Sequence, residues 1–233
     1  MVANHFSTIY ISLLFQNKIY DEDTIIDDEK HYYSDGYTSS KWISEGLCNI
    51  AKKRGISCNV YRLGLVLPSF KNYVYPSHQW FGRLIKTCLT FSMFPKEFID
   101  QGIQVACVDD ISKSIVHLIV DSSIKNRNLH LFSPKLLSYR AVFKQMQELF
   151  DCKEVELSTW LEKYKIQRAK NEIPIISVIE EIIEANNPGS FNNKFLSVKT
   201  CKLLNKGGIK YRDIDKDYIN SILRSALSTT FMQ

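Results

Sequence analysis

The chain has 233 residues, of which 45% are hydrophobic and 24% are charged, and its formal net charge is +5. This composition is that of an ordinary globular protein and excludes a disordered or fibrous chain. The positive charge is too small to predict nucleic-acid binding. No apolar run reaches the roughly 18 residues that a membrane span needs, so no membrane segment is expected.

The cysteines and histidines show no spacing typical of metal ligands. The six cysteines lie far apart without a C-x-x-C pair, and the five histidines share no ligand pattern. We therefore expect neither a zinc site nor any other metal site, and no disulfide framework. Reduced thiols are typical of the cytoplasm, which is the expected location.

The first half of the chain predicts a strand, a loop, a helix and a second strand. Residues 6–15 are rich in β-branched and aromatic side chains, as in a strand buried in a parallel sheet. An acidic, polar loop follows, and residues 38–54 then show helical periodicity. Residues 58–67 form the second strand, so the order implies a βαβ unit. The predicted helix has one apolar stripe: Trp42, Ile43, Leu47, Ile50 and Ala51.

The second half of the chain is predicted to be mostly helical. Residues 70–101 are aromatic and interrupted by prolines, which is typical of an insertion on the substrate side. Short strands are expected at 103–108 and 129–132, with a helix between them that Asp109 or Asp110 caps. Further helices are expected at residues 139–150, 158–170, 175–185 and 218–226.

Tyr37 and Lys41 form a Tyr-x-x-x-Lys pattern where the first helix begins. Residues four apart share one helix face, so the phenol and the ammonium can point into one pocket. A nearby cation favours the phenolate and lowers the tyrosine pKa from about 10, as a general acid for a carbonyl oxygen requires. The pattern alone also fits a surface Tyr and Lys that merely flank a helix start.

Two neighbouring segments favour the catalytic interpretation. Ser7 and Thr8 lie in the first predicted strand, where they could present a hydroxyl to the cleft at the strand's carboxyl end. The second strand contains Arg62-Leu63-Gly64, and a glycine there would permit close approach of the backbone to a ligand. Glu45, one turn beyond Lys41, could orient that lysine or form an ordinary ion pair with it.

These segments resemble the extended short-chain dehydrogenase/reductase family. Within it they look most like the thioester reductase domains of nonribosomal peptide and polyketide synthetases and of carboxylic acid and aminoadipate reductases. The resemblance rests on Gly36-Tyr37-Thr38-Ser39-Ser40-Lys41-Trp42 with Glu45, on Val108-Asp109-Asp110-Ile111, and on Gly208-Ile209 with Asp213-Ile214-Asp215. One departure is Arg62-Leu63-Gly64, where the family usually has Arg-Pro-Gly.

The resemblance implies a set of functional residues. Thr8, Tyr37 and Lys41 would be the catalytic triad, with Ser7 as the alternative hydroxyl. The expected cofactor contacts are Tyr37, Lys41, Arg62, Gly64, Leu65 and Val66. The cofactor would be NADPH rather than NADH. The substrate would be an acyl or peptidyl thioester on the phosphopantetheine of a carrier protein, and the product an aldehyde or alcohol.

The resemblance also implies an α/β fold with a doubly wound, Rossmann-like parallel sheet. Residues 1–135 would form part of the NAD(P)-binding domain, including the insertion at 70–101, and residues 136–233 a mostly helical substrate lid. The glycine-rich turn that holds a pyrophosphate, G-x-G-x-x-G, is absent from the sequence. We therefore expect a fragment whose first strands are missing, and the missing N-terminal half of the domain is a second expected partner.

Two other interpretations remain open. The chain could belong to another extended family member, such as a nucleotide-sugar epimerase or a fatty acyl reductase. It could also be a non-catalytic remnant that kept the fold and lost its cofactor half.

The absent glycine-rich turn leads to a first prediction. The 233-residue chain by itself should bind NADPH weakly or not at all, because it has no turn to hold the pyrophosphate. Isothermal titration calorimetry on the purified chain tests this. A dissociation constant of about 1 μM or below, equivalent to about −8 kcal/mol, would contradict the prediction.

Overall fold

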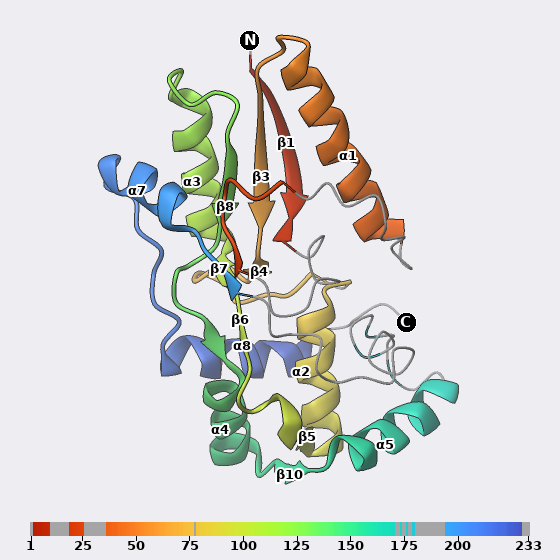
Figure 1. Ribbon diagram of the computed structural model, residues 1–233. Helices are drawn as coiled ribbons and strands as arrows, with labels where there is room; N and C mark the ends of the chain where they lie inside the picture. Colours follow the sequence, from red (N-terminus) through yellow and green to blue (C-terminus); the bar gives the residue numbers. More distant parts are fainter. Residues whose placement is uncertain are drawn as a thin grey trace. The chain divides into compact units, whose positions relative to one another are not determined.

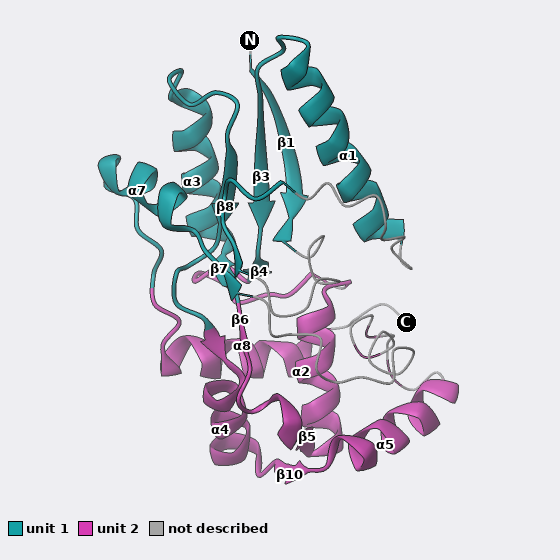
Figure 2. Cartoon of the chain, viewed as in Figure 1, with its two compact units in different colours: residues 1–67, 104–136, 189–212 teal, residues 68–103, 137–188, 213–233 magenta. Residues whose placement is uncertain are grey.

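The computed structural model describes residues 2–9, 19–25, 36–76, 78–170, 173, 176, 179 and 194–229. The chain divides into two compact units, each assembled from separate stretches of sequence (Figure 2). Unit 1 comprises residues 1–67, 104–136 and 189–212, and unit 2 comprises residues 68–103, 137–188 and 213–233.

Unit 1 is built on a parallel sheet, as the sequence predicts. Its strands are β1 (Ala3–Thr8), β3 (Cys58–Leu63) and β8 (Asn128–Leu131), in the order β1-β3-β8. The register aligns Ser7 with Arg62 and Arg62 with His130. Figure 1 shows these strands side by side with helix α1 (Gly36–Lys53) along them. Strands and helices in this arrangement confirm the expected α/β class.

Gly64 interrupts the second predicted strand. The chain forms β3, passes Gly64, and continues as β4 (Leu65–Leu67), which pairs in parallel with β7 (Val105–Cys107). A Cβ atom on Gly64 would lie 2.5 Å from the backbone oxygen of Gln104, and the Leu65 N–H donates to that same oxygen at 2.8 Å. The close approach that requires glycine is thus made by the chain's own backbone.

The face of the sheet away from α1 carries the apolar core of unit 1. Tyr61, Leu129 and Leu131 pack there with Ile111 and Leu118 of helix α3, and all five are almost fully buried. Burial of a large apolar side chain contributes roughly 1.5–3 kcal/mol, so this cluster is a main source of stability.

Helix α3 (Val108–Val120) begins differently from the prediction. Its N-cap residue is Cys107, and no side chain caps it. Asp110, expected as a cap, instead accepts hydrogen bonds from the backbone N–H and Nε of Arg212 at 3.0 and 2.9 Å. The carboxylate lies in the first turn, where it also complements the helix dipole. The aspartate is therefore a tertiary contact.

Helix α1 reverses the expected placement of its apolar stripe. Ile43, Leu47 and Ile50 are 53%, 60% and 47% exposed, whereas Glu45 on the inward face is 4% exposed. Thr38 is buried beside it on the same inward face. The sequence pattern locates a stripe but does not say which face meets the sheet. Here polar partners on the sheet decide the orientation.

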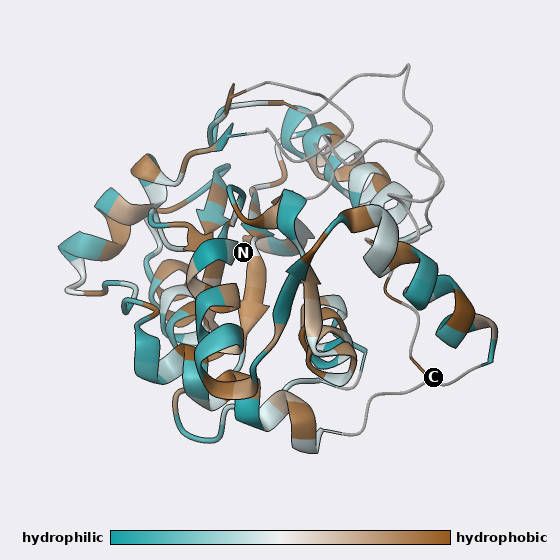
Figure 3. Cartoon of the chain, turned by 90° about the horizontal axis from the view of Figure 1, so that it is seen from below, coloured by the Kyte–Doolittle hydropathy of each residue, from teal (hydrophilic) through white to brown (hydrophobic). Residues whose placement is uncertain are grey.

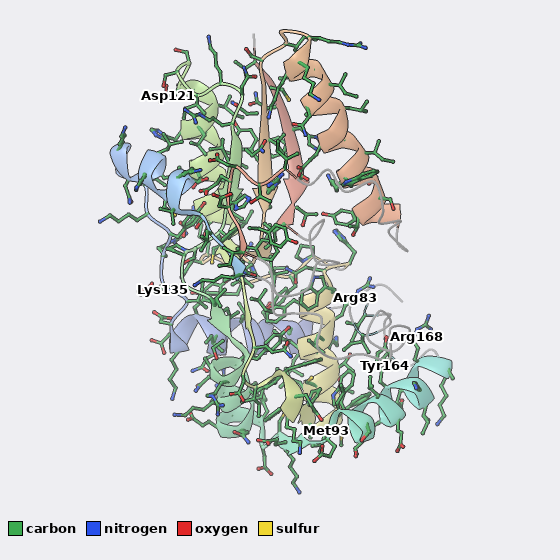
Figure 4. All side chains as sticks on the ribbon, viewed as in Figure 1. Arg83, Met93, Asp121, Lys135, Tyr164 and Arg168 are labelled. Atoms are coloured by element: carbon green, nitrogen blue, oxygen red, sulfur yellow. The ribbon has the colours of Figure 1, made fainter. Side chains whose placement is uncertain are left out.

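Unit 2 consists mainly of helices. Figure 3 shows hydrophilic and hydrophobic residues interspersed along the helices of the chain. The described residues of unit 2 include helices α2 (Trp80–Phe91), α4 (Tyr139–Phe150), α5 (Leu157–Ala169) and α8 (Lys216–Ser228). Two strand pairs accompany them: β5 (Met93–Pro95) with β10 (Lys153–Val155) in parallel, and β6 (Gly102–Ile103) with β9 (Leu137–Ser138) antiparallel. Tyr164, labelled in Figure 4, lies on α5. It accepts a hydrogen bond from the Ile176 N–H at 3.1 Å.

The predicted helices agree unevenly with these elements. The helix expected at 139–150 matches α4 at both ends, and those at 158–170 and 218–226 correspond to α5 and α8. Helix α2 lies inside the stretch 70–101, where the sequence indicated only an aromatic insertion. The helix expected at 175–185 lies almost entirely outside the described residues.

The boundary between the units is also different from the expected one near residue 135. Strand β11 (Lys194–Phe195) pairs with β2 (Ile19–Tyr20), and helix α7 (Val198–Lys206) follows it in unit 1. The Thr200 N–H donates to Glu22 at 2.8 Å, which ties α7 to the segment after β2. Residues near 200 thus complete the sheet unit, not the helical subdomain.

The contact at Gly64 yields a stability prediction. Gly64→Ala should lower the free energy of unfolding by about 2 kcal/mol, because the new methyl group would press against a backbone oxygen that cannot rotate away. Urea denaturation measures the difference. Gly46→Ala is the matched control: it lies inside α1 with nothing within 4 Å of the new Cβ. It should raise stability by about 0.5–1 kcal/mol. Equal effects from both variants would contradict the packing explanation.

Candidate active site

The structure brings Tyr37 and Lys41 together at the carboxyl end of β1. Lys41 Nζ donates to the backbone oxygen of Phe6 at 3.0 Å and lies 5.8 Å from the centroid of the Tyr37 ring. Tyr37 is 59% exposed at the start of α1. The helix therefore holds the cation beside the phenol and leaves the phenol accessible.

Thr8 and Ser7 occupy the last two positions of β1, and both are buried. Successive strand residues point to opposite faces, so Ser7, which is aligned with Arg62, faces α1 and Thr8 faces away. Thr8 Oγ1 lies 3.5 Å from the backbone oxygen of Leu63, a long contact for a hydrogen bond. Ser7 Oγ has no hydrogen-bond partner among the described residues.

A buried ion pair holds α1 to the sheet. Glu45, one turn beyond Lys41, receives three hydrogen bonds from Arg62 on β3, two from Nε at 3.1 Å and one from Nη2 at 2.8 Å. Both side chains are almost completely buried. Neither sequence interpretation of Glu45 included this partner, because Arg62 lies 17 residues away and was assigned to the cofactor.

The ion pair continues into a network that crosses to β8. Arg62 Nη1 donates to the Thr24 backbone oxygen at 3.0 Å and lies 3.4 Å from His130 Nε2. The other ring nitrogen, Nδ1, lies 2.6 Å from the Leu196 backbone oxygen. We assign the tautomer from this network: Nδ1 donates to Leu196, and Nε2 accepts from Arg62. A neutral ring therefore satisfies both neighbours.

Burial, followed by the nearby Arg62 cation, lowers the pKa of His130 from its ordinary value to about 4. The tautomer explains the direction, because a proton on Nε2 would face the guanidinium N–H. No sequence signal pointed to His130, which has no partner at recognisable spacing. Only the pairing of β3 with β8 places it beside Arg62.

The predicted cofactor residues thus separate into two groups. Tyr37 and Lys41 lie together at the end of β1. The Arg62 guanidinium is enclosed by Glu45 and His130, and Arg62 is 2% exposed, so its predicted contact with a cofactor stays a prediction that this side-chain pairing does not explain. Leu65 is buried and Val66 half-buried in the short strand after Gly64. Their predicted contacts with a cofactor stay predictions.

Comparison with known proteins shows what the chain is similar to. Residues 1–115, just under half of the chain, match a family of NAD-binding domains described as male sterility protein. Over 195 residues, the chain is 25% identical to a linear gramicidin synthase of Brevibacillus parabrevis, a match that covers 81% of this chain and 4% of that protein. It is also 25% identical over 150 residues to the glycine betaine reductase ATRR of Emericella nidulans, a match that covers 63% of this chain and 12% of that protein.

Solved structures extend the likeness beyond residue 115. The terminal R domain of the myxalamid PKS-NRPS pathway superimposes with a TM-score of 0.81 at 20% identity, over 97% of this chain and 57% of that one. An archaeal thiolation-reductase di-domain gives 0.69 at 19% identity, over 95% and 48%. The fold is therefore that of a reductase domain, and the chain spans about half the length of these two solved structures.

Membrane helices and metal clusters are both absent from the described part of the chain. Within it, no helix is both long and apolar enough to span a membrane, and no three His, Cys, Asp or Glu side chains are grouped as a metal site would need.

The His130 network predicts how stability depends on pH. Between pH values of about 6.5 and 4 the unfolded chain binds a proton on this histidine that the folded chain excludes. Stability should therefore fall as the pH falls through this range. The loss should reach about 3 kcal/mol, because one pH unit of difference corresponds to about 1.4 kcal/mol.

Urea denaturation at a series of pH values measures this dependence. His130→Gln removes the titrating group, so the variant should lose less stability on acidification than the parent chain, whatever its stability at pH 7. His5, whose pKa burial also lowers, is unchanged in both proteins and cancels in the comparison. Parallel curves for the two proteins would contradict the assignment.

Proposed function

We propose that this chain is the C-terminal part of a thioester reductase that uses NADPH to reduce a carrier-bound acyl or peptidyl thioester to an aldehyde or alcohol. The observation that carries the proposal is the position of Lys41. Its ammonium donates to the Phe6 backbone oxygen and lies near the ring of Tyr37, which is one helical turn earlier. A cation and an accessible phenol at the carboxyl end of a parallel strand are suited to protonating a carbonyl oxygen.

The residues present fit one end of the proposed cofactor. An ammonium group has three N–H donors, and Lys41 gives one to Phe6, so others are available for a ribose hydroxyl. The pyrophosphate end lacks its glycine-rich turn in this sequence. We propose that the N-terminal half of the domain supplies that turn.

The open edge of the sheet supports the proposal that an N-terminal half of the domain packs beside β1. Among the described strands, β1 is outermost and pairs only with β3. Phe6, two residues before the end of β1, stacks on Tyr61 with ring centroids 5.3 Å apart and is still 41% exposed. A parallel strand added beside β1 would satisfy the open edge and cover this ring.

In the proposed reaction a hydride would pass from NADPH to the carbonyl carbon of the thioester. Tyr37 would donate its phenolic proton to the carbonyl oxygen as negative charge develops there. Lys41, held near the ring, would stabilise the phenolate that Tyr37 becomes. Thr8, or Ser7 as the alternative, would donate a second hydrogen bond to the same oxygen. Collapse of the resulting hemithioacetal would break the C–S bond and release the carrier thiol with an aldehyde.

Structural comparison favours this substrate class over the epimerase alternative. The UDP-glucuronic acid 4-epimerase of Bacillus cereus superimposes with a TM-score of 0.59, below the 0.81 of the myxalamid R domain. The archaeal structure is a thiolation-reductase di-domain, which supports a carrier protein as partner. The role of the unit 2 helices as a substrate lid stays a prediction.

The direct test is substitution of the phenol in the natural full-length protein that contains these residues. Tyr37→Phe should reduce thioester-dependent NADPH oxidation at least about 100-fold, because it removes the proton donor and leaves the ring in place. Absorbance at the NADPH band, with a pantetheine-linked acyl thioester as substrate, follows the reaction. Circular dichroism of the variant should match the parent.

Lys41→Met is a second test of the mechanism, and Lys53→Met is its matched control. Both lysines are on α1, but Lys53 is exposed in the last turn and far from Tyr37. Loss of activity should follow only from Lys41→Met. Unchanged turnover in Tyr37→Phe would reject the mechanism, and a parent protein with no turnover on any thioester would favour the non-catalytic alternative.

A further inference from the structure

A cleft in unit 1 lies at the opposite end of α1 from Tyr37, and we call it the amino-end cleft. Its volume is about 440 Å³, within the size range of small-molecule sites. It lies between the end of α1, the first residues of β8, and α7. Its lining residues are Glu22, Asp23, Ile25, Asn49, Lys52, Asn126, Arg127, Asn128, Leu129, Lys199, Lys202 and Leu203.

The amino-end cleft is separate from the proposed catalytic pair. Lys52 Nζ donates to Oδ1 of Asn128, the first residue of β8, at 3.1 Å, so the cleft lies at the amino end of that strand. Lys41 is at the carboxyl end of β1 and three turns earlier on α1. At about 1.5 Å per residue, about 16 Å of helix separates the two lysines. The catalytic chemistry therefore does not account for this cleft.

In the described part of the chain, some of the charged side chains around the cleft have partners of opposite charge, and others do not. Lys199 forms ion pairs with Asp21 and Asp23. The Glu22 carboxylate is buried and accepts the Thr200 N–H at the start of α7. The acidic side chains of the cleft are thus already engaged.

Three further cations have no carboxylate partner anywhere in the described residues. These are Lys52, Arg127 and Lys202. Arg127 and Lys202 are exposed, whereas Lys52 is half-buried and donates to the amide oxygen of Asn128. Burial lowers the pKa of Lys52, although Glu45 and two nearby thiols act in the opposite direction. An anion in the cleft would further favour the charged form.

Three of the residues that line the cleft are apolar: Ile25, Leu129 and Leu203. Leu129 is buried in the core cluster of unit 1, so Ile25 and Leu203, which packs against that cluster, present the apolar surface. Asn49 and Asn126 also line the cleft, and Asn126 Oδ1 accepts a hydrogen bond from the Cys58 N–H at 3.0 Å. We propose that the amino-end cleft binds an organic phosphate, with the phosphate on Lys52, Arg127 and Lys202 and an apolar body against Ile25 and Leu203. Arginine and lysine are the usual partners of phosphate oxygens.

Phenyl phosphate is a suitable probe, because it combines one phosphate with a small apolar ring. Titration of the 233-residue chain by calorimetry or by NMR should give a dissociation constant of about 1 mM or below. Inorganic phosphate should bind roughly tenfold more weakly, because it lacks the ring, and phenol should not bind measurably. Equal affinity for phenyl phosphate and inorganic phosphate would overturn the role of the apolar side chains.

Paired substitutions locate the site. The double variant Arg127→Gln with Lys202→Gln should weaken phenyl phosphate binding at least about tenfold, and both side chains are exposed, so folding should be unaffected. Lys53→Gln removes a neighbouring charge that does not line the cleft and should leave the affinity unchanged. No binding at about 5 mM probe, or equal losses in the double variant and in Lys53→Gln, would overturn the proposal. Tyr37→Phe should bind the probe like the parent chain, so this result is independent of the catalytic one.

Discussion

Glu45 and Arg62 form the contact on which the geometry of unit 1 depends. The three hydrogen bonds between them join α1 to β3, the middle strand of the sheet. They fix the rotation of the helix about its own axis and its position along β3. Because Lys41 is one turn earlier on the same helix, this rotation also sets its ammonium against the Phe6 backbone oxygen. Removing either partner would leave a buried charge unpaired, which costs about 3–5 kcal/mol in proteins.

The same contact explains why α1 buries polar residues and exposes apolar ones. Arg62 places a full positive charge on the sheet face beneath the helix. Its guanidinium also donates hydrogen bonds to the Thr24 backbone oxygen and to His130 Nε2. Only a helix face that offers a carboxylate can pack on such a surface without loss of hydrogen bonds. The stripe at Ile43, Leu47 and Ile50 is consequently directed outward.

Helix α1 also separates two chemical environments within unit 1. Its first turns hold Tyr37 and Lys41 at the carboxyl end of β1, where the sheet edge is open among the described strands. Its last turns bring Lys52 to the amino end of β8, where it lines the amino-end cleft. The neutral His130 between the two ends keeps the interior of the network free of a second positive charge, and it does so only above its lowered pKa.

The sequence by itself determined the α/β class, the position of α4 and the pairing of Tyr37 with Lys41, because each depends on local periodicity or on residues one helical turn apart. Tertiary structure alone decided the partner of Glu45, the burial of Arg62 and the inclusion of residues 194–212 in the sheet unit. It also paired Asp110 with Arg212 instead of the predicted cap, and it placed Gly64 against the Gln104 backbone. These outcomes depend on which strands lie side by side, and contacts between residues distant in sequence leave no periodic signal.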